Sequence, residues 1–264
     1  MVMRLRLGRA KTSANPSFAG RLGALGLGFC AVLALMPSVA TAAEFTPDQR
    51  RAIEGIIKNY LTKNPEVMME ALQAAEDKIK SEAHDKAAAA LAKDRDQVFD
   101  DPTTPVGGNP KGDVSLVEFF DYRCPYCKQV EPALEALLGQ DHQLRFVYKE
   151  FPVLGPESVT AARAALAARQ QGKYAAFHRA MMAVKGEFDE AAVFKVASSV
   201  GLDVDRLKRD MDAPEIDRTL KDNLTLAAAL DIRGTPGFVI GNEIVPGAVS
   251  LDTLKKLIRK ARKK

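Results

Sequence analysis

Two cysteines with two residues between them form the segment Cys124-Pro125-Tyr126-Cys127. Cysteine thiolates are both nucleophiles and metal ligands, so this spacing offers chemistry. The third cysteine, Cys30, lies in the apolar N-terminal region. A disulfide between such close neighbours closes almost no loop and adds little stability. The spacing therefore favours thiol–disulfide exchange over a structural role.

The residues around the pair predict a strand before it and a helix after it. Val114 to Phe120 is a short, mostly apolar run, and Pro125 suits the first turn of a helix, where its missing N–H needs no partner. Cys124 would then lie at the positive end of the helix dipole, where backbone N–H groups stabilise a thiolate. Cys127, one turn further in, would be more buried. This asymmetry predicts that Cys124 attacks and that Cys127 resolves the mixed disulfide.

Two other roles for the pair are half of a zinc site and a pair of inert core thiols. Zinc needs two further ligands, and the sequence has neither a second cysteine pair nor a histidine pair at ligand spacing. His84, His142 and His178 are isolated in the sequence and are expected to be exposed or structural. We therefore expect no metal site and no cofactor. Cu(I) stays open as a ligand of the two thiolates, because it is soft enough to prefer sulfur.

A second candidate element lies far downstream, at Gly234-Thr235-Pro236-Gly237. A proline immediately before a strand is tolerated where its missing donor is not needed. A cis bond between Thr235 and Pro236 would expose the Thr235 backbone to an extended peptide beside Cys124.

Residues 1–43 have the layout of a secretory signal peptide. Basic residues without any acid precede an uncharged run from Leu22 to Met36, followed by Pro37 and by small residues at 40–43 that suit cleavage. An uncleaved membrane anchor is the alternative, because residues 22–43 carry no charge. The Gly and Ala content and Pro37 favour cleavage and export.

The formal charge of +4 comes from 38 Lys and Arg against 34 Asp and Glu. Residues 1–43 hold five of the basic residues and no acid, so the rest of the chain is close to neutral. Such a balance gives no electrostatic reason to bind nucleic acid.

Residues 44–99 are predicted to form a helical stalk. Helix start signals stand at Thr46-Pro47-Asp48 and Asn64-Pro65-Glu66. Apolar residues then follow at spacings of a short coiled-coil seam: Met68, Leu72, Ala75 and Ile79. A narrow apolar stripe cannot bury itself alone, so the stalk either docks on the following domain or pairs with copies of itself. We favour a homo-oligomer.

Residues 100–113, rich in Pro and Gly, are predicted to be a linker or entry loop before a domain at 114–264. After the first strand and helix, the patterns predict a strand at 144–148, helices within about 156–211 and at 214–230, a hairpin at 237–245 and a final helix at 251–259. This order predicts an α/β fold with a small mixed sheet and a helical insertion.

Residues from about 97 to 262 resemble the thioredoxin fold as it is built in DsbA-family thiol–disulfide oxidoreductases. The likeness is carried by Glu118 to Cys127, by Glu131 and by Gly234-Thr235-Pro236. The helical insertion distinguishes this family from thioredoxin and glutaredoxin. The stalk resembles that of the oligomeric, copper-tolerance-type members.

The resemblance implies a role for each matching residue. Cys124 would be the nucleophile, Cys127 the resolving thiol and Pro236 the cis-proline. Thr235, Pro125 and Tyr126 would contact the substrate.

Glu118 matches the family's buried acid that helps to move the Cys127 proton, with Lys149 as its charge partner. The alternative for Glu118 is a carboxylate on an edge strand that faces water; its apolar neighbours argue against this.

Strongly oxidising members of the family have His where this chain has Tyr126, and Thr before the cis-proline resembles the disulfide isomerases. Both features favour an exported isomerase or reductase in the periplasm, acting on client proteins and served by a membrane redox partner of DsbB or DsbD type. The alternatives are a DsbA-like oxidase, a Cu(I) carrier and a scaffold in which the stalk is the functional part.

Overall fold

The computed structural model describes residues 45–186 and 188–263, so the expected signal peptide lies outside the described residues. The chain divides after Tyr60 into two compact units, the second of which comprises residues 61–264 and contains the cysteine pair. None of the described helices is long and apolar enough to cross a membrane.

The N-terminal region is helical, as predicted, with two short breaks: α1 (Pro47–Lys63), α2 (Pro65–Lys93) and α3 (Arg95–Phe99). Thr46 and Gln49 cap the first helix reciprocally. The Gln49 N–H donates to Thr46 Oγ1 at 3.2 Å, and the Thr46 N–H donates to the Gln49 side chain at 2.9 Å. A proline occupies the first position of α2, which confirms the second start signal.

The seam residues of α2 do not pack on the domain. Met68, Leu72 and Ile79 are 50%, 57% and 66% exposed, and α1 has no buried residue. Docking of the seam is therefore not observed, and self-association stays a prediction. The stalk also ends earlier than residue 99, because Leu91 and Phe99 are buried in the domain core.

The sheet has the strand order β1-β3-β2-β4-β5 and is mixed, as predicted. Its central pair, β2 (Val114–Phe120) and β3 (Leu144–Glu150), is parallel, and both strands are buried over nearly their whole length. The hairpin of β4 (Gly237–Ile240) and β5 (Glu243–Pro246) joins it antiparallel, through β4 on β2.

The segment 100–113 is not a linker, because it contributes the edge strand β1 (Val106–Gly108), which pairs antiparallel with β3. A strand this short and rich in glycine has no periodic pattern to reveal it. Gly107 is needed for its close approach to the sheet: a Cβ there would lie 2.7 Å from Tyr148 Oη.

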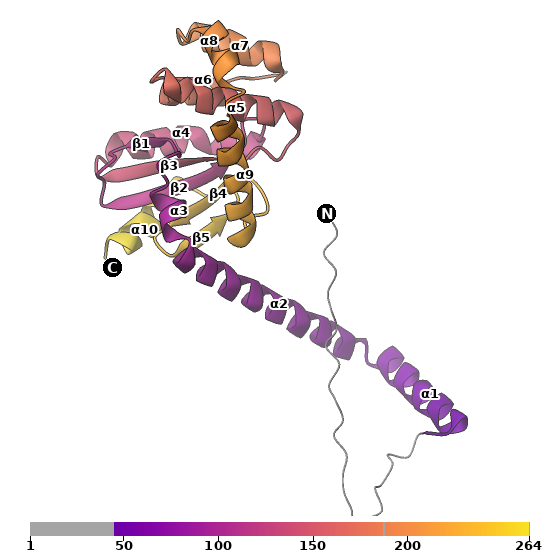
Figure 1. Ribbon diagram of the computed structural model, residues 1–264. Coiled ribbons are helices and arrows are strands. Elements are labelled where there is room, and N and C mark those ends of the chain that lie inside the picture. The colour runs from indigo at the N-terminus through magenta and orange to yellow at the C-terminus, as the bar shows by residue number, and fades with distance from the viewer. Residues whose placement is uncertain (1–44, 187, 264) are drawn as a thin grey trace, which may run out of the picture. The chain divides into compact units, whose positions relative to one another are not determined.

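Helices cover both faces of the sheet (Figure 1). On one face, α4 (Pro125–Gln140) and α10 (Leu251–Arg262) share a hydrophobic core with the insertion between β3 and α9. On the other face, α3, the end of α2 and α9 (Pro214–Ala229) pack over a second core. The alternation of side chains along β2 and β3 decides which residue enters which core.

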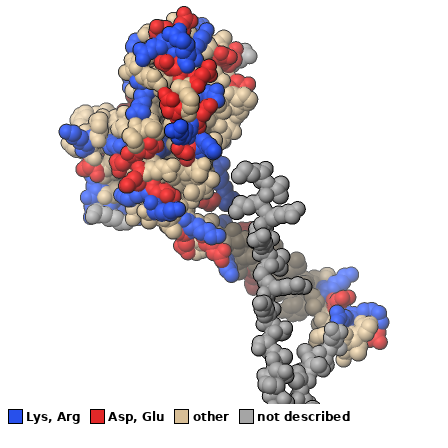
Figure 2. All heavy atoms as spheres, in the orientation of Figure 1, with Lys and Arg blue, Asp and Glu red and all other residues tan. Residues whose placement is uncertain are grey.

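The insertion comprises the four helices α5 (Pro156–Gln170), α6 (Tyr174–Met182), α7 (Glu190–Ser199) and α8 (Val204–Asp210), within the range predicted. The final helix α10 begins where predicted and runs to Arg262, three residues beyond the predicted end at Arg259. Lys and Arg are interspersed with Asp and Glu over the face of the molecule shown in Figure 2.

Candidate active site

The cysteine pair lies at the junction of β2 and α4, as predicted. Cys124 is the N-cap residue of α4, in an extended conformation, and Pro125 occupies the first turn. The Cys124 N–H donates to the Asp121 carbonyl at 3.0 Å, which closes the turn between the strand and the helix. Both cysteines are free thiols in this structure.

Cys124 contacts the loop that contains Pro236. Its Sγ donates to the Thr235 carbonyl oxygen at 3.2 Å, across a sequence separation of 111 residues. The Thr235–Pro236 peptide bond is cis, as expected. The two segments meet because β4, which follows Pro236, pairs with β2 through Gly237 and Phe119.

The expected hydrogen bonds from the helix to the Cys124 sulfur are not formed in this structure. The side chain of Cys124 makes no capping bond to the first turn of α4. As a thiol it has a proton to donate, and the Thr235 carbonyl accepts it. The backbone N–H groups of the first turn of α4 can donate to this sulfur once it is a thiolate.

Cys127 differs from Cys124 in its surroundings. It is fully buried, and this burial, followed by the charge of Glu118, raises the pKa of its thiol. Cys127 therefore keeps its proton unless a base nearby accepts it, which agrees with a resolving rather than an attacking thiol.

Glu118 is the carboxyl whose charge acts on Cys127. It lies on the central strand β2, fully buried, and neither of its carboxylate oxygens has a hydrogen-bond partner among the described residues. Burial, then the charges of Glu131, Cys124 and Glu150, raise the pKa of Glu118 well above its usual range. The alternative of a water-facing carboxylate on an edge strand is thereby excluded.

Lys149 is not the charge partner of Glu118, contrary to expectation. Glu118 is paired with Tyr148 in the parallel register, so the next residue, Lys149, points to the opposite face of the sheet. There its ammonium donates to Thr104 Oγ1 at 2.7 Å and to the Gln97 carbonyl at 2.8 Å, and pairs with Asp101 at 3.3 Å.

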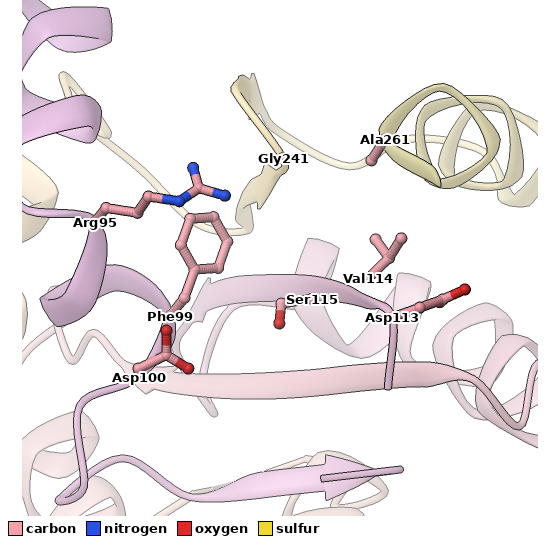
Figure 3. Close-up of a pocket in the computed structure, with 8 residues that line it drawn as sticks. All are labelled: Arg95, Phe99, Asp100, Asp113, Val114, Ser115, Gly241 and Ala261. Atoms are coloured by element: carbon pink, nitrogen blue, oxygen red, sulfur yellow. The ribbon is translucent and has the colours of Figure 1, made fainter. Parts of the chain in front are cut away.

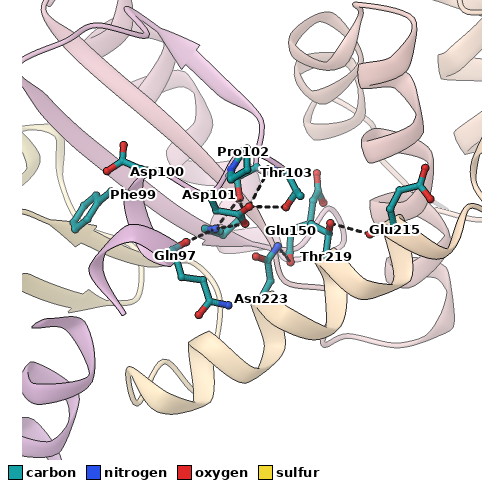
Figure 4. Close-up of polar contacts among 12 residues, drawn as sticks. Gln97, Phe99, Asp100, Asp101, Pro102, Thr103, Glu150, Glu215, Thr219 and Asn223 are labelled. Carbon is teal, nitrogen blue, oxygen red and sulfur yellow. Dashed lines mark hydrogen bonds and ion pairs between the residues drawn. The ribbon is translucent and has the colours of Figure 1, made fainter. Parts of the chain in front are cut away.

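Burial lowers the pKa of this ammonium. Figure 4 shows Gln97, Asp101 and Thr103 gathered in this cluster. Lys149 thus fastens the segment after α3 onto the sheet.

A buried polar cluster on the Glu118 side of the sheet was missed by the sequence analysis. One Glu150 oxygen accepts from Tyr122 Oη at 3.0 Å and from Tyr174 Oη at 2.7 Å. His178 Nδ1 lies 3.1 Å from Tyr122 Oη, and His178 Nε2 lies 3.6 Å from Glu131. The sequence offers one indication of this cluster. Glu131 comes four residues after Cys127 and therefore lies on the same side of α4. Of the three histidines, His178 is buried, whereas His84 and His142 are exposed.

Exposed apolar side chains lie beside the motif. Tyr126 is 60% exposed, and Val153 and Leu154 on the loop after β3 are also exposed. Asp121 holds this loop in place, since its carboxylate accepts from the Val153 N–H at 2.9 Å and the Leu154 N–H at 3.0 Å. Such a surface is suited to contact with an extended or unfolded chain.

A cavity elsewhere in the domain is not part of this site. Figure 3 shows Arg95, Asp113, Ser115 and Ala261 among its lining residues. It lies at the amino end of β2, whereas Cys124 follows the carboxyl end of that strand. Among the described residues, no group of three or more His, Cys, Asp or Glu side chains is placed to hold a metal ion.

Residues 115–259 match the DSBA-like thioredoxin domain family, and residues 49–82 match the copper resistance protein ScsC N-terminal domain. A solved thioredoxin-like oxidoreductase from Silicibacter pomeroyi DSS-3 is 49% identical, with a TM-score of 0.64, over 64% of this chain and 98% of that chain. The catalytic domain of Proteus mirabilis ScsC is 32% identical, with a TM-score of 0.62, over 67% of this chain and 99% of that chain.

Curated relatives match over a smaller part of their length. The Na(+)/H(+) antiporter NhaA 1 of Salinispora arenicola is 29% identical over 158 residues, which are 59% of this chain and 24% of that protein. The chain thus spans about a quarter of the length of this relative.

The burial of Glu118 predicts a dependence of stability on pH. A carboxyl whose pKa is raised by folding stabilises the native state below its unfolded pKa, and this contribution is lost as the pH rises through the folded value. Glu150, whose pKa burial raises to about 8, acts in the same direction. The free energy of unfolding of the reduced protein should therefore fall between about pH 5 and pH 8.

Glu118→Gln should flatten this fall, by about 1.4 kcal/mol for each unit by which folding raises the pKa. Urea titrations at a series of pH values measure the effect. Glu70→Gln, an exposed change on α2, is the control and should leave the slope unchanged. Equal slopes for the wild type and Glu118→Gln would contradict the assignment of a buried, uncompensated carboxyl.

Proposed function

Because the chain belongs to the DSBA-like thioredoxin domain family, we propose that it is a thiol–disulfide oxidoreductase acting on exported proteins in the periplasm. The thioredoxin-like fold with its helical insertion is the one predicted from the sequence. The observation that carries the proposal is the placement of Cys124 at the start of α4, in contact with the cis Thr235–Pro236 loop, with Cys127 buried behind it beside Glu118.

The chemistry follows from these positions. The Cys124 thiolate attacks one sulfur of a client disulfide, and the other client sulfur leaves as a thiolate and takes up a proton. Cys127 then gives its proton to the Glu118 carboxylate and attacks the Cys124 sulfur. The bond from Cys124 to the client breaks, and the client leaves reduced while the pair becomes a disulfide. Two electrons have passed from the dithiol to the client.

Within this class, the chain is best suited to isomerisation or reduction. A neutral Tyr126 offers no cationic donor to the Cys124 thiolate, so the disulfide should be a milder oxidant than in members with His at this place. The disulfide isomerases also have Thr before the cis-proline, as this chain has Thr235. A membrane redox partner of DsbB or DsbD type would set the working state of the pair.

The N-terminal helices support the proposal of an oligomer. The seam residues Met68, Leu72 and Ile79 are exposed on α2, and residues 49–82 match the N-terminal domain named for a copper resistance protein. Burial of this apolar stripe between copies of the chain would present several cysteine pairs to one client.

Refolding of scrambled ribonuclease tests the activity directly. The reduced protein should restore ribonuclease activity, Cys124→Ser should abolish the effect, and Cys127→Ser should accumulate mixed disulfides because the captured client is not released. Activity confined to oxidising reduced ribonuclease would instead support a DsbA-like oxidase. Tight Cu(I) binding without any exchange would support a carrier and contradict the proposal.

A substitution in the exposed seam tests whether the stalk drives oligomerisation, without disturbing the fold of the monomer. Leu72→Lys places a charge in the exposed seam and should convert the oligomer to a monomer that still exchanges disulfides but isomerises poorly. Light scattering measures the native mass. Ser81→Lys, exposed on the same helix outside the seam, is the matched control and should stay oligomeric. A monomeric wild-type chain would contradict the oligomer.

A further inference from the structure

The charges of the chain are divided unequally between its final helix and the part before it. Residues 251–264 contain seven Lys and Arg and one acid, whereas residues 44–250 contain 26 Lys and Arg and 33 Asp and Glu. The C-terminal segment therefore has a net charge of +6, and the preceding part has a net charge of −7. The two nearly cancel in the total, but in space they give a strongly basic helix on a net-negative body.

The helical periodicity of α10 places its central basic residues on the side away from the core. The buried face of the helix consists of Leu254 and Ile258, with three half-buried apolar residues beside them. With about 3.6 residues per turn, Lys256, Arg259 and Lys263 fall on the opposite face, and all three are exposed. We call these three residues the basic stripe.

The basic residues that flank the stripe are already bound to neighbouring elements. Lys260 pairs with Glu243 at 2.6 Å, and Arg262 pairs with Asp113 at 2.9 Å and with Asp141 at 2.7 Å. The three residues of the stripe, in contrast, have no acidic side chain within ion-pair distance in the part of the chain that the structure describes. The flanking charges thus fasten α10 to the domain, and the charges of the stripe are left for a partner outside it.

The helix dipole explains only part of this arrangement. Basic residues near the C-terminus of a helix are stabilised by its negative end, which accounts for Arg259 and Lys263. Lys256 lies farther from that end, where the dipole has little effect. It also has Arg259 and Lys260 three and four residues away, and like charges at these spacings destabilise a helix. An anionic surface bound to the stripe would relieve this repulsion.

The stripe lies on the half of α10 that is farther from the cysteine pair. The helix begins shortly after β5, the strand that ends beside the cis-proline loop. It ends where Arg262 bonds to Asp113 and Asp141, which adjoin the amino end of β2 and the carboxyl end of α4. Cys124 is at the other end of both elements (Figure 1). A surface that binds the stripe would therefore leave Cys124 accessible.

The chemistry of the stripe suits an anionic membrane surface better than a protein. Protein interfaces bury apolar anchors and contain few lysines at their centre, and no large apolar side chain of α10 is exposed beside the stripe. A bilayer presents many negative headgroups in one plane, and every Lys or Arg close to it adds to the attraction. The net-negative body of the domain opposes this binding little, because its repulsion is screened beyond a Debye length.

Resting on the export proposed above, we propose that the basic stripe of α10 binds the anionic phospholipid headgroups of a membrane. The attachment is electrostatic and reversible. It holds the oxidoreductase at the surface across which its clients are exported, with the cysteine pair at the end of the domain away from the bound half of α10.

Sedimentation with vesicles tests the proposal on the exported protein as it is purified from its host. Vesicles of phosphatidylcholine with about one quarter phosphatidylglycerol should bind the wild type, and vesicles of phosphatidylcholine alone should not. The triple variant Lys256→Gln, Arg259→Gln, Lys263→Gln should bind the charged vesicles about a hundredfold more weakly, at about fivefold for each charge. Salt at about 1 M should release the wild type, because the Debye length is then about 3 Å.

A triple variant with the same change of charge elsewhere is the matched control. Lys185→Gln, Lys195→Gln and Arg209→Gln alter exposed residues of the helical insertion and should leave the binding unchanged. Residues 1–43 of the sequence are unaltered in both variants, so a difference between them is due to α10. Both variants should keep the circular dichroism spectrum of the wild type and its rate of exchange with glutathione disulfide.

Equal binding of the two triple variants would overturn the proposal, and so would equal binding of the wild type to charged and uncharged vesicles. Tighter binding to a DNA duplex or to polyglutamate than to the vesicles, at the same salt, would also overturn it, because the partner would then be another kind of polyanion. Vesicle binding needs no thiol chemistry. A protein that binds charged vesicles through α10 but fails in the ribonuclease assay would therefore contradict the proposed function alone.

Discussion

The burial of a thiol and a carboxyl on one face of the sheet is the constraint on which the site depends. Cys127 and Glu118 are both fully buried, and the charge of Glu118 disfavours the ionisation of Cys127. Cys124, three residues after Asp121, contacts the cis-proline loop instead. This difference in surroundings separates the sulfur that meets a client from the sulfur that releases it.

The parallel register of β2 and β3 determines which charges take part. It places Glu118 beside Tyr148 and turns Lys149 to the opposite core, where that lysine holds the segment after α3. On the Glu118 side of the sheet, His178 of the helical insertion lies 3.6 Å from Glu131. The insertion thus contributes a basic group to the core behind the cysteines in addition to covering the sheet.

Much of this arrangement can be predicted from the sequence, because local residue patterns specify it. The start signals at Pro47 and Pro65, the strand before Cys124 and the hairpin after Pro236 each have their own residue pattern, and the structure contains all of them. Glu118 is recognisable as buried because its neighbours on the strand are apolar.

What the sequence does not reveal depends on register and on long-range packing. The strand β1 is too short and glycine-rich to show a period, and the side on which Lys149 lies follows only from its pairing with Phe119. His178 meets Tyr122 across 56 residues, a distance that no local pattern spans. The self-association of the N-terminal helices stays a prediction.

The central claim is that the two thiols of the reduced pair differ in reactivity because of where they lie. Alkylation with a limiting amount of iodoacetamide at neutral pH, with fragment-ion mass spectrometry to assign the label, tests this most directly. The account predicts that Cys124 is modified while Cys127 remains a thiol. Modification of Cys127 at a rate equal to or above that of Cys124 would contradict it.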